Sequence, residues 1–209
     1  MDQNKNYNIL KKFYKNKKIL ITGATGFKGA WLSFWLYKMG AKVYTNGNNP
    51  NKNKNLFYGL GLEKKTNLNI FDIRNFYKLN KLIKRIKPSV VFHLAAQPLI
   101  LKSYEEPRET YEINTMGTLN LLEASRKNDS IKSLICITSD KCYESNYSTK
   151  GFKETDRLGG KDPYSGSKAS AEIIINTYNE SFFNNGKLIC SMKVEIAVLE
   201  EFNKYLPAN

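Results

Sequence analysis

The sequence of 209 residues contains only three cysteines and one histidine, and both scarcities limit what the protein can be. Cys136, Cys142 and Cys190 fit neither a disulfide framework nor a zinc site, so we expect a reducing cytoplasm and no bound metal. No apolar run approaches the roughly 18 residues of a membrane span. Residues 1–18 also lack the continuous apolar core of a signal peptide. The sequence therefore argues against secretion and against residence in a membrane.

Acidic residues are scarce as well, because 19 Asp and Glu stand against 33 Lys and Arg, a net charge of +14. Such a charge suits nucleic acid, an anionic membrane surface or a phosphorylated substrate. Over residues 76–87, lysines alternate with apolar residues spaced three or four apart, which indicates an amphipathic helix with a solvated basic face. No zinc finger, aromatic nucleic-acid platform or basic zipper occurs in the sequence. We therefore expect a Lys-rich surface and no nucleic-acid partner.

Short apolar segments rich in branched residues alternate with segments of helical periodicity. We expect strands over residues 18–22, 42–45, 68–71, 89–93 and 133–138, and helices over residues 27–39, 75–86, 109–127 and 163–180. The alternation predicts an α/β fold, a Rossmann-type doubly wound parallel sheet with helices on both faces. A polar stretch over residues 46–55 predicts a loop, and no repeat or linker divides the chain.

A glycine-rich segment follows the first expected strand. The run Thr-Gly-Ala-Thr-Gly-Phe-Lys-Gly places Gly23, Gly26 and Gly29 between a buried strand and an amphipathic helix. In that context the first glycine makes a tight turn, the second lets backbone amides approach a pyrophosphate, and the third lets the helix pack on the strand. A turn without a ligand is the alternative, and the missing Gly-Lys-Ser/Thr excludes a nucleotidase-type phosphate loop. We predict a dinucleotide site.

The acid that usually follows the second strand of such a fold is absent. Residues 27–62 contain no Asp or Glu, so the choice between NAD and NADP cannot be made from an acid on the ribose hydroxyls. Asp72, after the third expected strand, is placed to accept a hydrogen bond from an adenine amino group, with capping of its own loop as the alternative. His93 ends the fourth strand near the ligand edge of the sheet, and we expect a structural hydrogen-bonding role for it rather than catalysis.

A second motif, Asp-Pro-Tyr-Ser-Gly-Ser-Lys, runs from Asp162 to Lys168. Asp162 is a good N-cap and Pro163 a good first helical residue, so Tyr164 and Lys168 should lie one turn apart on a helix face. We expect the ammonium and a nicotinamide cation to lower the pKa of Tyr164, so that the phenol exchanges a proton with a substrate hydroxyl.

These motifs resemble the extended short-chain dehydrogenase/reductase family over residues 17–183. Within it, Phe-Lys-Gly-Ala-Trp-Leu, Ala-Gln-Pro-Leu, Ser-Asp-Lys-Cys-Tyr and Gly-Gly-Lys-Asp-Pro-Tyr are similar to the CDP-glucose 4,6-dehydratase branch. The resemblance implies NAD as the cofactor and residues 1–183 as an NAD-binding domain with the catalytic residues. It assigns the cofactor contacts to Gly23, Thr25, Gly26, Phe27, Gly29, Asp72, Ile73, Leu94, Ala95, Ala96, Gln97, Asn114, Tyr164 and Lys168.

A 4,6-dehydratase moves hydride from sugar C4 to NAD, removes water across C5 and C6, and returns the hydride to C6. The resemblance implies Tyr164 with Lys168 as the base for the C4 hydroxyl and Ser139 as the donor to O4. Asp140 and Lys141 remain as the pair for elimination. The dTDP-glucose relatives have Asp-Glu there, whereas Asp-Lys is similar to the CDP-glucose branch. Lys141 is either a desolvated base or an electrostatic clamp on developing enolate charge, and the sequence leaves both open.

The end of the sequence departs from that family, which continues through a further strand into an Arg/Gly/Asn-containing loop and a substrate domain. Residues 191–209 differ from that pattern. We therefore expect residues 184–209 to be a divergent tail, the fold to be truncated after the region of the sixth strand, and turnover to be impaired.

The expected partner is a nucleotide sugar, CDP-glucose above all, in nucleotide-sugar metabolism and O-antigen biosynthesis. The helices over residues 109–127 and 163–180 would pair two copies, as such helices do in the family. One alternative is another family enzyme: a nucleotide-sugar 4-epimerase, or a dTDP-glucose or GDP-mannose 4,6-dehydratase. An epimerase would have no use for Asp140 and Lys141. The other alternative is a catalytically silent dinucleotide-binding fragment.

Overall fold

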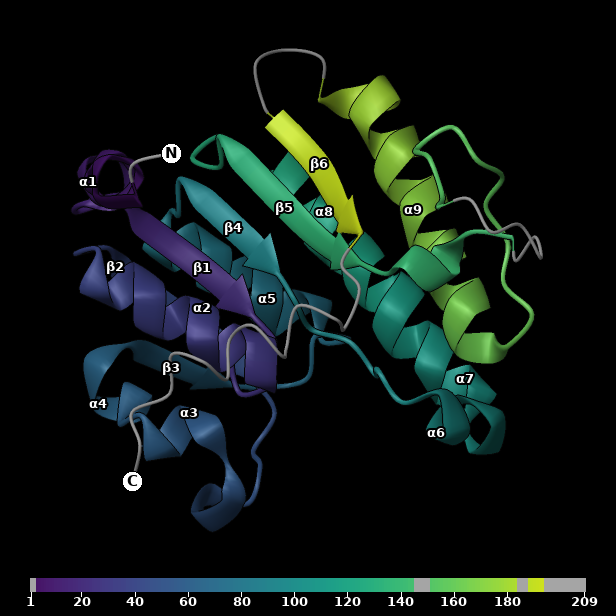
Figure 1. Ribbon diagram of the computed structural model, residues 1–209, viewed down its shortest axis with the longest axis horizontal. Coiled ribbons are helices and arrows are strands. Elements are labelled where there is room, and N and C mark those ends of the chain that lie inside the picture. The colour runs from purple at the N-terminus through teal and green to yellow at the C-terminus, as the bar shows by residue number, and fades with distance from the viewer. Residues whose placement is uncertain (1–2, 145–150, 184–187, 194–209) are drawn as a thin grey trace.

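A six-stranded sheet forms the centre of the protein in a computed structural model that describes residues 3–144, 151–183 and 188–193 (Figure 1). The strands are β1 (Lys18–Thr22), β2 (Lys42–Gly47), β3 (Asn67–Ile70), β4 (Val90–His93), β5 (Ser133–Thr138) and β6 (Leu188–Lys193). All neighbours pair in parallel, in the order β3-β2-β1-β4-β5-β6. The order reverses direction between β1 and β4, as in dinucleotide-binding folds, so the predicted doubly wound sheet is confirmed.

Helices precede, connect and cover these strands (Figure 1). They are α1 (Gln3–Tyr14), α2 (Phe27–Lys38), α3 (Leu56–Gly59), α4 (Leu62–Lys65), α5 (Phe76–Ile86), α6 (Ile100–Glu105), α7 (Pro107–Tyr111), α8 (Gly117–Arg126) and α9 (Pro163–Phe182). The described residues also form two 3-10 turns, η1 (Lys52–Lys54) and η3 (Asp140–Cys142), and a π turn, η2 (Glu112–Met116). Among the described helices, none combines the length and apolarity needed to cross a membrane.

The core lies in two layers, one on each face of the sheet. Leu20 of β1 belongs to a cluster with residues of α5, α8 and α9, whereas Ile19 and Ile21 belong to a second cluster with residues of α2, α3 and α4. Successive residues of a strand point to opposite faces, so a strand buried on both sides must be apolar throughout. This explains why the run Ile-Leu-Ile, fully buried here, predicted a central parallel strand.

The end of β2 differs from the expectation of a loop from residue 46. Asn46 pairs with Thr22 across β1 and is only 1% exposed. Its side-chain amide donates to the carbonyl oxygens of Asn69 at 3.3 Å and Phe71 at 2.9 Å. These bonds satisfy a buried polar group inside the sheet, which is why the strand continues through a polar residue to Gly47.

The helix expected over residues 109–127 is divided into α7, the π turn η2 and α8. Asn114 lies in the π turn and is buried. Its amide bonds both backbone groups of Gln97, with Oδ1 accepting from the Gln97 N–H at 2.8 Å and Nδ2 donating to the carbonyl at 3.1 Å. A π turn therefore coincides with an inward side chain that holds a distant loop, a frequent setting for such turns.

Several elements were not predicted from the sequence: the short helices α3, α4 and α6, and two longer elements, α1 and β6. Helix α1 forms before β1, and its last residue, Tyr14, packs against the cluster around Ile19. Strand β6 lies inside the expected divergent tail and pairs with β5 over its six residues, from Leu188 opposite Ser133 to Lys193 opposite Thr138. The sheet therefore includes a sixth strand within residues 184–209.

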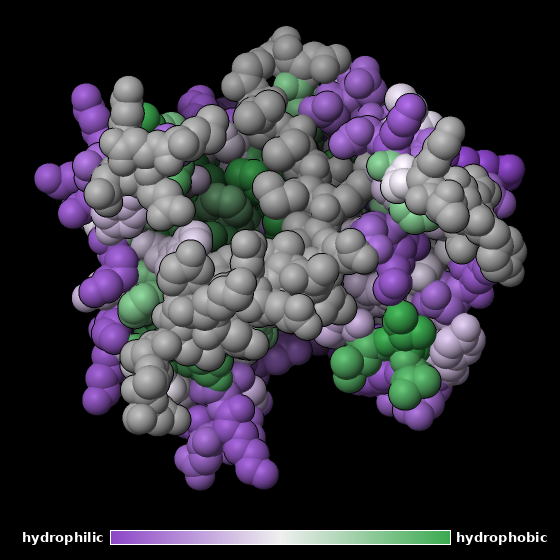
Figure 2. Space-filling model, viewed as in Figure 1, coloured by the Kyte–Doolittle hydropathy of each residue, from purple (hydrophilic) through white to green (hydrophobic). Residues whose placement is uncertain are grey.

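The face of the molecule in Figure 2 is largely hydrophilic where the structure describes it, in keeping with the net charge. An apolar patch at the lower right of Figure 2 coincides with α6 in Figure 1, where Leu99 is 62% exposed and Leu101 81% exposed.

Candidate active site

A cavity of about 660 Å³ lies where the strands end. Its wall contains residues that follow β1, β2, β3, β4 and β5, so it occupies the carboxyl edge of the sheet, where doubly wound folds bind ligands. Its size is that of a small-molecule or cofactor site. The predicted site residues in its wall are Gly23, Thr25, Gly26, Phe27, Gly29, Asp72, Ile73, Leu94, Ala95, Ala96, Ser139, Asp140, Lys141, Tyr164 and Lys168.

The glycine loop is built by contacts that differ from one glycine to the next. Gly23 has a left-handed φ of +71°, and a Cβ there would lie 2.5 Å from the Ala95 nitrogen. A Cβ on Gly29 would lie 2.2 Å from the Gly23 carbonyl oxygen. The fold itself thus requires both glycines.

Gly26 stands apart from those two glycines. Its backbone is extended, and among the described residues a Cβ there would meet only the Gly23 carbonyl oxygen, at 3.2 Å. It is also the N-cap of α2, and no side-chain hydrogen bond caps that helix end within the described part of the chain. Uncapped amides in the first turn of a helix favour binding of an anion, and Gly26, which precedes this turn, has no side chain to block an anion from reaching them.

Asp72 follows β3 and faces the cavity from the β3 edge of the sheet. Its carboxylate is bound by Arg74, through the backbone N–H at 2.8 Å and through Nε and Nη2 at 3.0 and 2.7 Å. Hydrogen bonds from the Arg74 side chain lower the pKa of Asp72, more than partial burial raises it. The carboxylate is therefore ionised at neutral pH.

Gln97 and Asn114 lie outside the cavity wall, although the sequence grouped them with the cofactor contacts. Gln97 donates to Thr110 Oγ1 at 3.0 Å, and Asn114 donates to Ser167 Oγ at 2.9 Å in addition to its two bonds with Gln97. Both residues act on the cavity through the loop that they hold, which contains Ala95 and Ala96.

Tyr164 and Lys168 extend from the first turns of α9 into the cavity wall. The expected cap is confirmed, since Asp162 Oδ1 accepts from the Ser165 N–H at 2.9 Å and Pro163 is the first helical residue. Burial raises the pKa of Tyr164, and a hydrogen bond with Ser139 partly offsets this. The pKa is thus raised where a lowering by the Lys168 ammonium was expected, because desolvation of the phenol dominates, and the contribution expected from a nicotinamide cation stays a prediction.

Lys168 is buried, with its Nζ 3.5 Å from the Ile137 carbonyl oxygen. Burial lowers its pKa to about 8, and the nearby Lys28 ammonium contributes. The group keeps its charge at pH 7 but lies close to the range where it would lose it.

Ser139 and Asp140 follow β5 at the end of the cavity that contains Tyr164. The Ser139 hydroxyl accepts from the Lys141 N–H at 3.3 Å and caps η3, and it also contacts Asp140 Oδ1 at 3.1 Å. The structure thus brings the serine, the tyrosine and the Asp-Lys pair to one end of the cavity.

Lys28 was missed by sequence analysis. It is the second residue of α2, and it lies in the cavity wall. Burial lowers its pKa, and the Asp140 carboxylate opposes that shift. The available signal was its place inside the glycine motif, but nothing local links that position to Asp140.

His93 has the structural role expected for it. Its Nδ1 is 2.6 Å from Thr22 Oγ1 and its Nε2 is 3.0 Å from Thr118 Oγ1, so the ring joins β1 to α8. Burial lowers its pKa to about 3, helped by the Lys168 charge. Within the described residues, no group of three or more His, Cys, Asp or Glu could hold a metal ion.

The strand order, the glycine loop and a cavity that joins a serine to a Tyr-x-x-x-Lys pair define an extended short-chain dehydrogenase/reductase. Comparison with known proteins narrows this class. The chain matches the family described as GDP-mannose 4,6 dehydratase over residues 20–191 and belongs to that family.

Individual relatives agree with this family. CDP-glucose 4,6-dehydratase of Salmonella typhimurium is 46% identical over 176 residues, covering 84% of this chain and 49% of the relative. CDP-paratose 2-epimerase of Salmonella typhi is 32% identical, covering 79% of this chain and 54% of the relative. The chain thus spans about half the length of these relatives.

Solved structures give the same fold. UDP-glucose 4-epimerase of Thermus thermophilus, in complex with NAD, superposes with a TM-score of 0.72 at 26% identity and covers 84% of this chain and 54% of that one. The enzyme of the same name from Thermotoga maritima, with UDP-glucose, gives a TM-score of 0.73 at 25% identity, with the same coverage of both chains.

Proposed function

We propose that this chain is the NAD-binding and catalytic part of a nucleotide-sugar 4,6-dehydratase that acts on CDP-glucose. One observation carries the proposal: a single cavity joins an uncapped glycine loop to Ser139, the Asp140-Lys141 pair and Tyr164. The identity to the Salmonella typhimurium CDP-glucose 4,6-dehydratase supports the choice of reaction and sugar nucleotide.

NAD fits the residues present. The first-turn amides of α2, reached over Gly26, would hold the pyrophosphate, and Asp72 would accept from the adenine amino group. The NAD complex of the Thermus enzyme supports the same cofactor here. When bound, NAD would take a hydride from sugar C4 and return it to C6 after water has left.

We assign to Tyr164 the role of accepting the proton of the sugar C4 hydroxyl. Its phenol contacts Ser139, so a hydroxyl placed between them would give its proton to Tyr164 while Ser139 donates to O4. Because burial raises the pKa of Tyr164, the phenolate would need a nearby cation, and we assign that role to the buried Lys168 ammonium, which keeps its charge at pH 7.

Loss of water is assigned to Asp140 and Lys141. If Lys141 is the base, it would remove the C5 proton as a neutral amine while a protonated Asp140 gives its proton to the departing O6 hydroxyl. If Lys141 stays charged and stabilises the enolate, the Asp140 carboxylate would take the C5 proton and pass it to O6 as water leaves. Lys28 lies near enough to Asp140 to interact with its charge, and so belongs to the same end of the site.

The proposal is tested by supplying NAD and CDP-glucose to a high concentration of the protein and following the 4-keto-6-deoxy product by its alkaline absorbance over long incubations, because turnover is expected to be impaired. We expect Asp140→Asn and Lys141→Met each to slow product formation by roughly a hundredfold or more, while bound NADH accumulates. Tyr164→Phe should prevent both signals, because the O4 proton has no acceptor. Lys153→Met, at an exposed position outside the cavity wall, is the matched control and should behave as the wild type.

A 4-epimerase is the second candidate, favoured by structural neighbours such as the Thermotoga maritima enzyme. An epimerase needs the tyrosine, serine and lysine but no elimination pair. Normal turnover after replacement of both Asp140 and Lys141, or inversion at C4 without loss of water, would establish it and reject the dehydratase.

We also propose that two copies pair through α9 and the neighbouring segment of η2 and α8, where Met116 is 48% and Ile173 55% exposed. Sedimentation velocity at micromolar concentration should show a dimer that Ile173→Glu dissociates. A wild-type monomer would contradict this assembly.

A further inference from the structure

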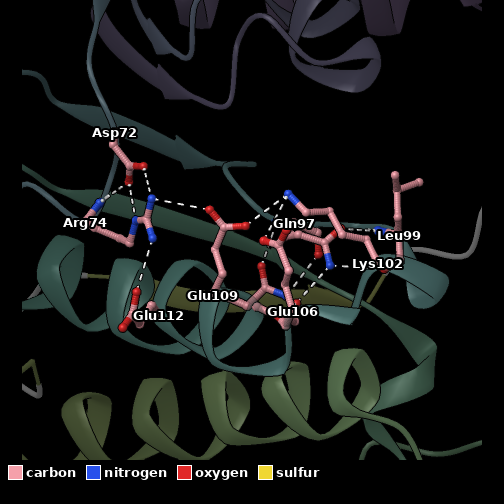
Figure 3. A network of polar contacts seen from close by, with 10 residues as sticks. Asp72, Arg74, Gln97, Leu99, Lys102, Glu106, Glu109 and Glu112 are labelled. Carbon is pink, nitrogen blue, oxygen red and sulfur yellow. Dashed lines mark hydrogen bonds and ion pairs between the residues drawn. The ribbon is translucent and has the colours of Figure 1, made fainter. Parts of the chain in front are cut away.

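Arg74 makes a two-pronged contact with Asp72 at the β3 end of the cavity (Figure 3). Its Nε and Nη2 donate to the two carboxylate oxygens, and its backbone N–H adds a third bond to Oδ1. Such a planar fork fixes the carboxylate in one orientation, which a single bond from an ammonium would not do.

Arg74 is itself held from the other side. Its Nη1 is 3.2 Å from Glu112 Oε2, and its Nη2 is 3.6 Å from Glu109 Oε1. Glu109 is bound in turn by Lys102 of α6 at 3.0 Å. Figure 3 shows the arginine between Asp72 on one side and Glu109 of α7 and Glu112 of η2 on the other. The backbone of the loop is fixed as well, because Asn120 of α8 donates to the Arg74 carbonyl oxygen at 3.0 Å.

The contacts leave Asp72 with one defined acceptor position. A carboxylate oxygen accepts about two hydrogen bonds. Oδ1 already accepts two, from the Arg74 N–H and Nε, whereas Oδ2 accepts one, from Nη2, among the contacts of the described residues. Asp72 lines the cavity, so the remaining acceptor position on its Oδ2 is on a residue of the cavity wall.

We propose that Arg74 is a positioning residue for cofactor recognition, which holds the Asp72 carboxylate in the orientation from which Oδ2 accepts the adenine amino group. The inference rests on the proposed function, since it requires NAD in the cavity. Arg74 does not touch the cofactor in this account. It sets the preference for adenine through Asp72.

The exposure of these ion pairs separates positioning from a role in folding. The Arg74 and Asp72 side chains are 35% and 37% exposed, and ion pairs this exposed contribute little to folding. Loss of Arg74 should therefore change the choice of ligand more than the melting temperature. Arg126 offers a matched control, because it makes the same fork with Glu123, at 2.8 and 2.7 Å, at the end of α8 and outside the cavity wall.

The experiment compares the affinities for NAD and for nicotinamide hypoxanthine dinucleotide, in which a carbonyl oxygen replaces the adenine amino group. We expect the wild type to prefer NAD by roughly ten- to a hundredfold, because the analogue places an acceptor against the carboxylate. Arg74→Met should reduce the preference to about threefold or less, chiefly by weakening NAD. Arg126→Met should retain it in full.

Arg74→Lys keeps the positive charge without the fork and should give an intermediate preference. It also decides the matter if Arg74→Met proves unfolded on thermal melting. A wild-type preference retained in Arg74→Met or in Arg74→Lys would overturn the inference. NAD binding by the wild type with no preference over the analogue would overturn it too, yet leave the proposed function standing. Failure of the wild type to bind either dinucleotide would reject both.

Discussion

At the scale of single residues, a role can be predicted from the sequence when the residue contacts others that are close to it along the chain. Gly29 and the Asp162 cap act on residues of their own motif, and their roles were predicted, as was the turn at Gly23. The close approach of Gly23 to Ala95 was not predicted. Lys28 interacts with the charge of Asp140, and Arg74 forms ion pairs with glutamates of α7 and η2. These partners come close only in the folded protein, so the importance of both residues was not predicted. The spacing of residues in the sequence cannot predict contacts between residues that are far apart along the chain.

His93 gives a prediction about pH. Its pKa is about 3 in the folded protein against 6.5 when unfolded, so the unfolded chain binds more protons between these values. Its contribution to stability is therefore complete above pH 6.5 and is lost as the pH falls toward 3. From pH 7 to 5 we expect it to reduce the free energy of unfolding by about 2 kcal/mol.

Urea denaturation of the wild type and of His93→Gln at the two pH values measures this contribution. The variant should be less stable at pH 7 and show a smaller drop on going to pH 5. An equal drop in both proteins would mean that the buried imidazole is not the group responsible.

At the scale of elements, α5 shows what periodicity can predict. Its apolar residues recur on one face, Asn75 caps its start by accepting from the Lys78 N–H, and the observed bounds lie within one residue of the prediction. The helix over residues 109–127 shows the limit. Its π turn depends on Asn114 binding Gln97, a contact made through the tertiary fold, so helical periodicity could not reveal it.

The buried face of α5 should carry its stability. Leu79 is fully buried in the cluster around Leu20, and Leu79→Ala should cost about 2–5 kcal/mol of unfolding free energy through lost burial and the cavity left behind. Tyr77→Ala is the control, since Tyr77 is 84% exposed on the same helix. Chemical denaturation that ranks the two variants equally would contradict this description of the core.

At the scale of the molecule, the alternation of apolar strands and helices was enough to predict a doubly wound sheet, because a right-handed crossover leaves few arrangements for such a sequence. The sheet order then gathers the ends of separate strands at one edge, and the predicted residues meet there. Side-chain roles within that edge were less predictable. Gln97 and Asn114 bind each other and hold a loop, a contact that exists only in the folded protein. The pKa of Tyr164 is raised because folding buries the phenol.

The central claim, that this cavity binds NAD, is tested most directly by a fluorescence titration of NADH. A Cβ at Gly26 would lie 3.2 Å from the Gly23 carbonyl oxygen, a tight contact, so Gly26→Val should lower the melting temperature somewhat. Because its side chain would also enter the path of the pyrophosphate, the variant, assayed below its melting temperature, should bind NADH roughly tenfold or more weakly. Gly59→Val is the control, since a Cβ at Gly59 would have no neighbouring atom of the described residues within 4 Å and the residue is absent from the cavity wall. Saturable binding by the wild type and the control, lost in Gly26→Val, is the predicted result. Equal affinity in all three proteins, or no binding by the wild type, would contradict the account.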